Sequence, residues 1–272
     1  MKITKLLILF LVSSLLFNCS SSDNNEESEI TDPVSFEKDL LKISGDDDHW
    51  LNYENGKINK AWSTGTTFRS QMAYNANGTM SKEYREGTGN PNFDNENFGW
   101  VVPFSEDYIE NIYENERLVE VIRHDSGDSW KLVEYAYQGD LVVEKKVFYG
   151  EDNSVDRIFT YQYNNQNEIT TIIWNETPSG GSSHTLQVTF DNKTNPYYKI
   201  WEDTKLIFWN AQDGPARYNL EFYPHNILKL QEEGSSDIWY EAFYTYDEDN
   251  YPTIMNITEG NQEGSNYYFE YQ

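Results

Sequence analysis

The sequence of 272 residues contains a single cysteine, Cys19. One cysteine cannot form an intramolecular disulfide, so disulfide bonds do not crosslink this fold. A chain of this length can bury a hydrophobic core large enough to be stable without such crosslinks. We therefore expect side-chain burial and strand pairing to stabilise the domain.

Basic residues are scarce: the chain has 20 Lys and Arg against 46 Asp and Glu, and its formal net charge is -26. Proteins that bind nucleic acids obtain most of their affinity from Lys and Arg side chains that neutralise phosphates. The composition therefore excludes nucleic acid as a partner. An anionic membrane surface would also repel the domain, and we interpret the acidic surface as a solubilising one.

Motifs of known catalytic and metal sites are missing too. The four histidines lack the HExxH motif and the close spacing of zinc sites, and no Gly-x-Ser-x-Gly motif occurs. The histidines are His49, His124, His184 and His225. The many carboxylates do not single out the two that a glycoside hydrolase needs, and the run 46–48 lacks EF-hand spacing. We predict no metal, no cofactor and no enzymatic activity, with a carboxylate-dependent hydrolase as the less favoured alternative.

Long hydrophobic runs are also rare, and the longest lies at the N-terminus. Residues 6–16 are almost wholly apolar and follow two lysines, Lys2 and Lys5. The run is shorter than the roughly 20 residues that a spanning helix needs. Its order of basic, apolar and small polar residues is typical of a secretory signal peptide, which we place at residues 1–18.

The residues around Cys19 resemble a known processing site. Leu16-Phe17-Asn18-Cys19 resembles the lipobox of bacterial lipoproteins, although Asn18 stands where that family prefers Gly, Ala or Ser. The acidic run from Asp23 to Glu29 is similar to the export signal of surface lipoproteins in Bacteroidota. The resemblance implies that Cys19 is acylated, and that the chain is attached through this lipid to the outer membrane and faces the cell exterior. Two or three acyl chains hold a protein to a bilayer much better than one.

The segment that follows differs in composition from the rest of the chain. Residues 19–36 are polar and acidic without hydrophobic periodicity, which is typical of a flexible tether. We predict a single domain over residues 37–272.

This domain is rich in aromatic residues, including 21 Tyr and eight Trp in the chain. A unit of about 25 residues recurs along it: an aromatic strand end, a polar turn rich in Asn, Gly and Asp, and a returning strand. The aromatic anchors of these units are Tyr53, Tyr74, Tyr113, Tyr137, Tyr163, Phe190, Phe222 and Tyr246. The pattern predicts an all-β fold of consecutive antiparallel β-hairpins that form a long twisted meander sheet or open barrel. A β-propeller is the alternative architecture.

The strand ends carry a family resemblance as well. Tyr135-Ala-Tyr137, Tyr161-Gln-Tyr163 and Tyr244-Thr-Tyr246 are similar to the YD-type repeats of Rhs-like proteins. They resemble still more closely the β-hairpin-repeat lipoproteins of unknown function in Bacteroidota, whose turns often read as Asp191 to Pro196 does here. The family pattern consists of turn and packing positions, so the resemblance implies no catalytic residues.

One insertion interrupts the repeat at residues 86–104 and contains Phe93, Phe98 and Trp100. A loop folded over one end of the sheet is the plainer interpretation. Binding residues concentrate in such loops, so these three aromatic residues are also the candidate ligand contacts.

The sequence predicts a non-enzymatic binding or scaffold module for a glycan or protein at the cell surface, with a glycan-binding component of a polysaccharide-uptake system as the alternative. A glycan-binding face would show at least two exposed, coplanar Trp or Tyr rings.

Overall fold

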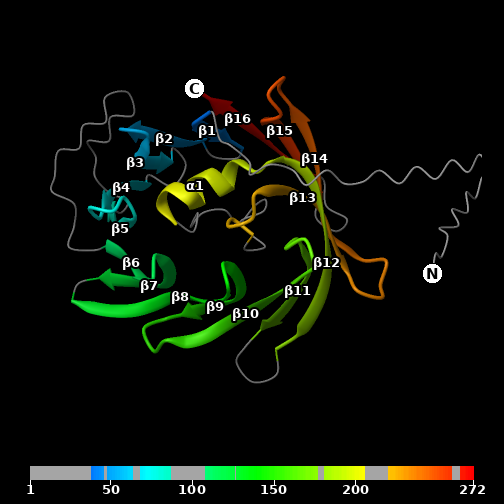
Figure 1. Ribbon diagram of the computed structural model, residues 1–272, viewed down its shortest axis with the longest axis horizontal. Coiled ribbons are helices and arrows are strands. Elements are labelled where there is room, and N and C mark those ends of the chain that lie inside the picture. Colours follow the sequence, from blue (N-terminus) through cyan, green and yellow to red (C-terminus); the bar gives the residue numbers. More distant parts are fainter. Residues whose placement is uncertain are drawn as a thin grey trace, which may run out of the picture. The chain divides into compact units, whose positions relative to one another are not determined.

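The computed structural model describes residues 38–45, 48–63, 68–86, 108–125, 127–176, 181–205, 220–258 and 264–272, with the backbone alone at 68, 69, 85 and 86. The described residues form sixteen strands and one helix (Figure 1). The first eight strands are β1 (Leu40–Ser44), β2 (Asp48–Glu54), β3 (Lys57–Ser63), β4 (Phe68–Tyr74), β5 (Met80–Glu86), β6 (Tyr108–Glu114), β7 (Arg117–Asp125) and β8 (Asp128–Gln138). The remaining elements are β9 (Leu141–Tyr149), β10 (Ser154–Tyr163), β11 (Ile169–Glu176), β12 (Ser183–Thr194), α1 (Pro196–Thr204), β13 (His225–Glu232), β14 (Ile238–Tyr246), β15 (Pro252–Thr258) and β16 (Ser265–Tyr271).

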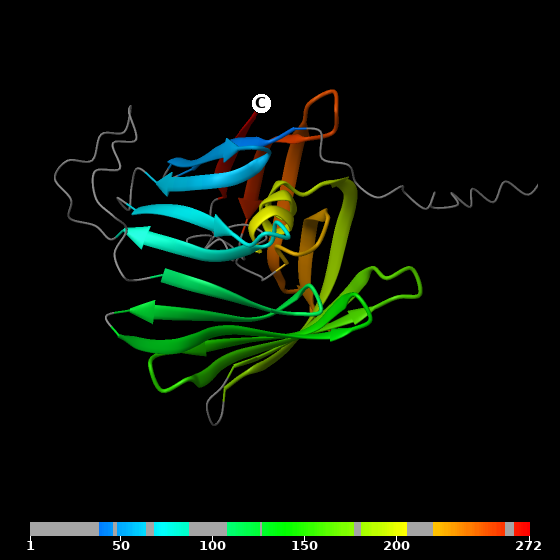
Figure 2. The same cartoon turned by 60° about the vertical axis from the view of Figure 1, so that its left-hand side comes forward.

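The strands form one closed barrel in which each strand pairs antiparallel with its neighbours in sequence (Figures 1 and 2). The predicted all-β fold of consecutive hairpins is therefore confirmed. The first and last strands close the sheet, with Leu40 opposite Tyr271 and Ile43 opposite Phe269. Closure leaves no free sheet edge among the described strands, which protects the barrel from edge-to-edge aggregation.

The polar turns of the repeat have the backbone conformation that tight hairpins need. Asn55 and Gly56, between β2 and β3, have φ angles of 55° and 73°. Two consecutive residues with positive φ match the twist of the flanking strands, and Asn and Gly adopt this conformation readily. The equivalent turn between β6 and β7 places Asn115 and Glu116 at φ angles of 50° and 66°. An ordinary side chain is rare there, so the Asn-Gly pair is the less strained version of the turn.

The aromatic anchors have a structural role in six of the eight predicted units. A β-bulge occurs directly before each of these anchors, where the strand register shifts by one residue. The six anchors are Tyr53, Tyr74, Tyr113, Tyr137, Tyr163 and Tyr246. Bulges bend and twist a strand. Their repetition at one end of the barrel helps the sheet to curve until it closes.

Tyrosine hydroxyls at this end connect a strand to the strand before it, and in four cases the two strands belong to successive hairpins. Tyr163 donates to the carbonyl oxygen of Val142 at 2.6 Å, and Tyr137 donates to that of Leu118 at 2.8 Å. Six tyrosines make this contact, at 2.5–3.3 Å, and we call them the inter-hairpin tyrosines: Tyr74, Tyr113, Tyr137, Tyr163, Tyr244 and Tyr271. The repeat seen in the sequence is thus a repeat of hydrogen bonds between hairpins.

The predicted hairpin units at Phe190 and Phe222 are wrong. Strand β12 continues past Phe190 to Thr194, and the chain then enters helix α1 (Figure 1). Asn195 is the helix N-cap: its side-chain oxygen accepts a hydrogen bond from the backbone N–H of Tyr197 at 3.0 Å. Pro196 follows at the first helical position, where its fixed φ suits a helix. A motif that resembles a turn therefore starts a helix, because the side chain of Asn195 provides an N-cap.

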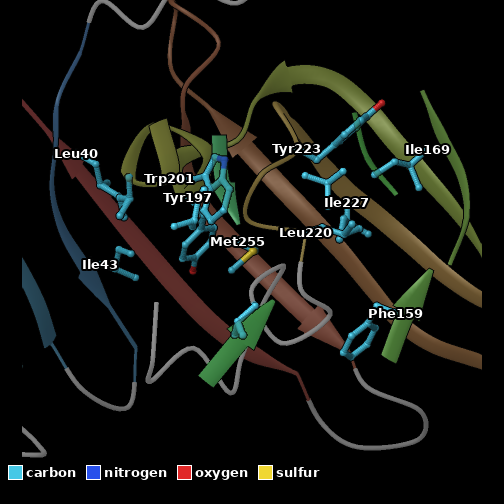
Figure 3. Packing of buried hydrophobic residues seen from close by; sticks show 14 of the residues in the cluster. Leu40, Ile43, Phe159, Ile169, Tyr197, Trp201, Leu220, Tyr223, Ile227 and Met255 are labelled. Atoms are coloured by element: carbon cyan, nitrogen blue, oxygen red, sulfur yellow. The ribbon is translucent and has the colours of Figure 1, made fainter. Parts of the chain in front are cut away.

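Helix α1 lies inside the barrel. Its side chains contact strands on opposite sides of the wall: Trp201 packs against Tyr135 of β8 at 5.5 Å between ring centroids, and Tyr197 packs against Phe269 of β16 at 6.1 Å. Figure 3 shows Tyr197 and Trp201 within the cluster of buried side chains that forms the core. Among the described residues, no helix is long and apolar enough to cross a lipid bilayer.

Candidate functional site

The two faces of the barrel wall differ in chemistry, and strand β8 illustrates this. Val133 and Tyr135 are buried, whereas Glu134 between them is partly exposed and bonds to Lys131 and Lys146. Because successive side chains of a strand point to opposite faces, the apolar residues face the interior and the charged ones face outward.

The outward face of β7, β8 and β9 carries a network of charges. Lys131 bridges Glu120 at 2.7 Å and Glu134 at 2.9 Å, and Lys146 reaches Glu134 at 3.2 Å. The hydrogen bond from Lys131 lowers the pKa of Glu134, so this carboxylate is ionised at neutral pH. Such an outer wall is suited to water, because charged side chains that face lipid destabilise a barrel.

The interior holds a buried ion pair. Lys145 of β9 contacts Glu221 at 2.6 Å between Nζ and Oε1, and the two side chains are 0% and 2% exposed. Tyr135 also donates a hydrogen bond to Oε1 of Glu221 at 3.3 Å. Burial lowers the pKa of Lys145, and the nearby carboxylate partly opposes this effect. Burial raises the pKa of Tyr135, and the charge of Glu221 raises it further.

Glu221 belongs to the connection between β12 and β13. We call the described residues of this connection, 195–205 and 220–224, the plug segment. Phe222 packs against Tyr161 of β10 at 5.0 Å, and Tyr223 packs against Phe190 of β12 at 4.2 Å, both between ring centroids. Asn111 of β6 donates to the carbonyl oxygen of Thr204 at 3.1 Å. Barrels of sixteen strands can enclose a water-filled channel. Here the described residues of the plug segment place aromatic and charged side chains inside the barrel.

One outward group has the chemistry of a hydrolase but not its surroundings. Ser129 lies 2.8 Å from Nδ1 of His124, and Nε2 of His124 lies 3.0 Å from Glu110. The carboxylate can only accept, so in the neutral imidazole Nε2 carries the hydrogen and Nδ1 accepts from the serine hydroxyl. The order serine, histidine, carboxylate occurs in catalytic triads. Here, however, Tyr108 stacks on the imidazole at 4.3 Å between ring centroids, and Ser129 lies within a paired strand. We therefore interpret the group as a structural chain of hydrogen bonds between side chains of neighbouring strands.

Neither this group nor the buried ion pair is among the sites that the sequence predicts. His124 and Ser129 lie opposite each other across the short β7–β8 turn, and their spacing of five residues was a usable signal. Glu110 joins them only through the pairing of β6 with β7. No sequence signal indicates the contact between Lys145 and Glu221, which are 76 positions apart.

The candidate site residues that the sequence indicates lie outside the part of the chain that the structure describes. Cys19 lies in the N-terminal 37 residues, and Phe93, Phe98 and Trp100 lie between β5 and β6. Their roles stay predictions.

Within the described ranges, no three His, Cys, Asp or Glu side chains gather as a metal site would need. Trp201 is 5% exposed and belongs to the buried core, whereas Trp62, 8% exposed, stacks on Trp50 at 5.9 Å between ring centroids.

Comparisons with known proteins connect the barrel to two solved structures. No protein-family model and no curated protein matches the chain. A porin-like protein from Bacteroides uniformis is similar with a TM-score of 0.52 and 10% sequence identity, over 86% of this chain and 95% of that one. A porin-like protein from Bacteroides vulgatus is similar with a TM-score of 0.50 and 11% identity, over 86% of this chain and 99% of that one. At these identities the likeness concerns the fold, a β-barrel.

Proposed function

We propose that this chain is a lipid-anchored, non-enzymatic binding or scaffold module at the cell surface. In this proposal an acylated Cys19 attaches a water-exposed barrel to the outer membrane. The observation that carries it is the charged outer face of β7, β8 and β9. Charged side chains face outward on β7 to β9, whereas a barrel that spans a bilayer presents an apolar band to lipid. A barrel of this polarity needs a separate membrane attachment, and acyl chains provide one.

The plug segment inside the barrel supports a binding or scaffold role over a pore. The plug segment contacts β6, β8, β9 and β10 through aromatic packing, a hydrogen bond and a buried ion pair. These contacts fix the plug segment to the wall. A barrel that is packed in this way offers its outer wall and its loops for recognition.

Replacing Cys19 tests the anchor. We expect Cys19→Ala to abolish metabolic labelling with a palmitate analogue and to remove the protein from the outer-membrane fraction, whereas the neighbouring Ser20→Ala changes neither. On intact cells, added protease should degrade the wild-type barrel, because the proposal places it at the cell surface. Retention of Cys19→Ala in the outer membrane after carbonate extraction would contradict the proposal, because the barrel itself would then be inserted in lipid.

A further inference from the structure

The outer wall of β14, β15 and β16 carries a group of side chains unlike the rest of the acidic surface. Inward positions of these strands are buried, among them Ala242, Met255 and Tyr267. The residues between them therefore face outward. Six of these outward residues are uncharged, and we call them the neutral patch: Phe243, Thr245, Ile254, Asn256, Asn266 and Tyr268.

Strand register places these residues next to each other. Asn256 of β15 lies opposite Phe243 on one side and opposite Asn266 on the other. Ile254 lies in the adjoining row, opposite Tyr268. Phe243 and Tyr268 are two inter-strand spacings apart, about 10 Å across the sheet. Along the strands they are two residues apart, about 7 Å.

The two aromatic rings of the patch are open to solvent. Phe243 is 58% exposed and Tyr268 is 49% exposed, and they are two of the three large hydrophobic residues that are exposed in the described part of the chain. Asn256 and Asn266 between them are joined by a hydrogen bond of 2.8 Å. That bond uses one amide donor and one carbonyl acceptor, and each carboxamide has further hydrogen-bonding capacity. The patch thus presents two apolar surfaces with amide groups between them, and Phe243 takes the place of one of the two Trp or Tyr rings expected from the sequence.

From this arrangement we infer that the neutral patch binds an uncharged oligosaccharide. The inference rests on the proposed surface-binding function and names its ligand class. The C–H faces of sugar rings would cover Phe243 and Tyr268, and their hydroxyl groups would bond to Asn256 and Asn266. The separation of the two aromatic residues suits two or more sugar units of a chain rather than a single ring.

Charge and area favour this ligand over the other occupants of an exposed sheet face. The net charge of -26 repels acidic polymers and a second copy of the chain. A stable protein interface covers roughly 800 Å² with about 20–30 residues on each side. The neutral patch has six residues and is bordered by the charged Glu241 and Glu270, so it is small for a protein partner.

Binding should be measured with the detergent-solubilised full chain and hexasaccharides of glucose, mannose, xylose and galactose, by saturation-transfer NMR and calorimetry. The hexamer of galacturonic acid is the charged comparison. We expect at least one neutral hexasaccharide to bind, and Phe243→Ala and Tyr268→Ala each to weaken its affinity about tenfold, since each removes a large apolar contact. Tyr149→Ala is the matched control, because Tyr149 is 76% exposed at the end of β9 and should leave binding unchanged.

Three outcomes would overturn the inference: no neutral hexasaccharide binds, the galacturonate hexamer binds as tightly as the best neutral one, or Tyr149→Ala weakens binding as much as Phe243→Ala. Circular dichroism of each variant shows whether the barrel is intact. Sedimentation velocity tests the second-copy alternative, since a dimer that Phe243→Ala dissociates would assign the patch to self-association. Because binding is measured in solution, its failure is distinct from failure of the anchor, which cell fractionation reports.

Discussion

At the scale of single residues, the inter-hairpin tyrosines explain why the chain contains so many tyrosines at strand ends. Each hydroxyl donates to a backbone carbonyl of the preceding strand, and the acceptor residues Ile58, Met80 and Leu118 are themselves almost fully buried. Phenylalanine would supply a similar apolar ring but could not donate this bond. The hydroxyl is therefore what distinguishes tyrosine at these positions.

Removing one of these hydroxyls should have a small and measurable cost. We expect Tyr163→Phe to lower the free energy of unfolding by about 0.5–1.5 kcal/mol, because the carbonyl of Val142 loses its donor. Urea unfolding measures the change, which should appear in the midpoint and leave the slope unaltered. The exposed Tyr149 provides the control, Tyr149→Phe, and an equal loss there would argue against a specific role for the hydrogen bond.

Alkaline pH should destabilise the barrel through the same residues. Burial raises the pKa of Tyr113 and Tyr137 to about 12, whereas an unfolded tyrosine titrates near 10. Between these values the unfolded chain binds fewer protons than the folded one, so stability is fully present below pH 10 and falls as the pH rises toward 12. Thermal unfolding between pH 8 and 12 checks the direction, and Tyr137→Phe should reduce the slope. A midpoint that stays constant to pH 12 would contradict the buried state of these hydroxyls.

At the scale of elements, the plug segment decides what kind of barrel this is. The connection from β12 to β13 leaves the wall at Asn195, packs α1 inside the barrel and returns through Glu221 and Phe222. Most other neighbouring strands are joined by short turns. One long connection therefore supplies much of the apolar surface that covers the inner wall.

The buried ion pair between wall and plug should respond differently to single and paired substitution. Lys145→Met leaves the carboxylate of Glu221 buried without its cation, which is expected to cost about 3–5 kcal/mol of unfolding free energy. The double variant Lys145→Met with Glu221→Leu removes both charges and should recover most of that loss. A double-mutant cycle by denaturant unfolding measures the coupling. Additive losses would show that the two charges do not stabilise each other.

At the scale of the whole molecule, the excess of acidic residues opposes compactness. The chain has a formal net charge of -26, so like charges repel each other on the folded barrel, and salt screens this repulsion over about 8–10 Å at physiological concentration. We expect the thermal midpoint to rise between 10 mM and 500 mM NaCl, by about 2–4 °C for each kcal/mol of repulsion that is relieved. Calorimetry measures the midpoint. A fall with added salt would show that outward ion pairs such as Lys131–Glu120 outweigh the net repulsion.

The sequence by itself determined the all-β class, the hairpin repeat and six of its eight aromatic anchors. These features depend on local chemistry: alternation along a strand, positive φ in Asn and Gly turns, and a tyrosine at a fixed place before each turn. The export signal and Cys19 are also local, and they remain predictions from sequence. The same local reasoning failed at Phe190 and Phe222, because an N-cap and a polar turn use similar residues.

Only the tertiary structure decided the closure of the sheet, the position of the plug segment and the direction in which each charge points. The contact between β1 and β16 joins residues more than 200 positions apart, and Lys145 meets Glu221 through a fold-wide arrangement. Alternation separates two faces of a strand, but it does not say which face becomes the interior. That assignment follows from the way all sixteen strands bury their apolar faces together around α1.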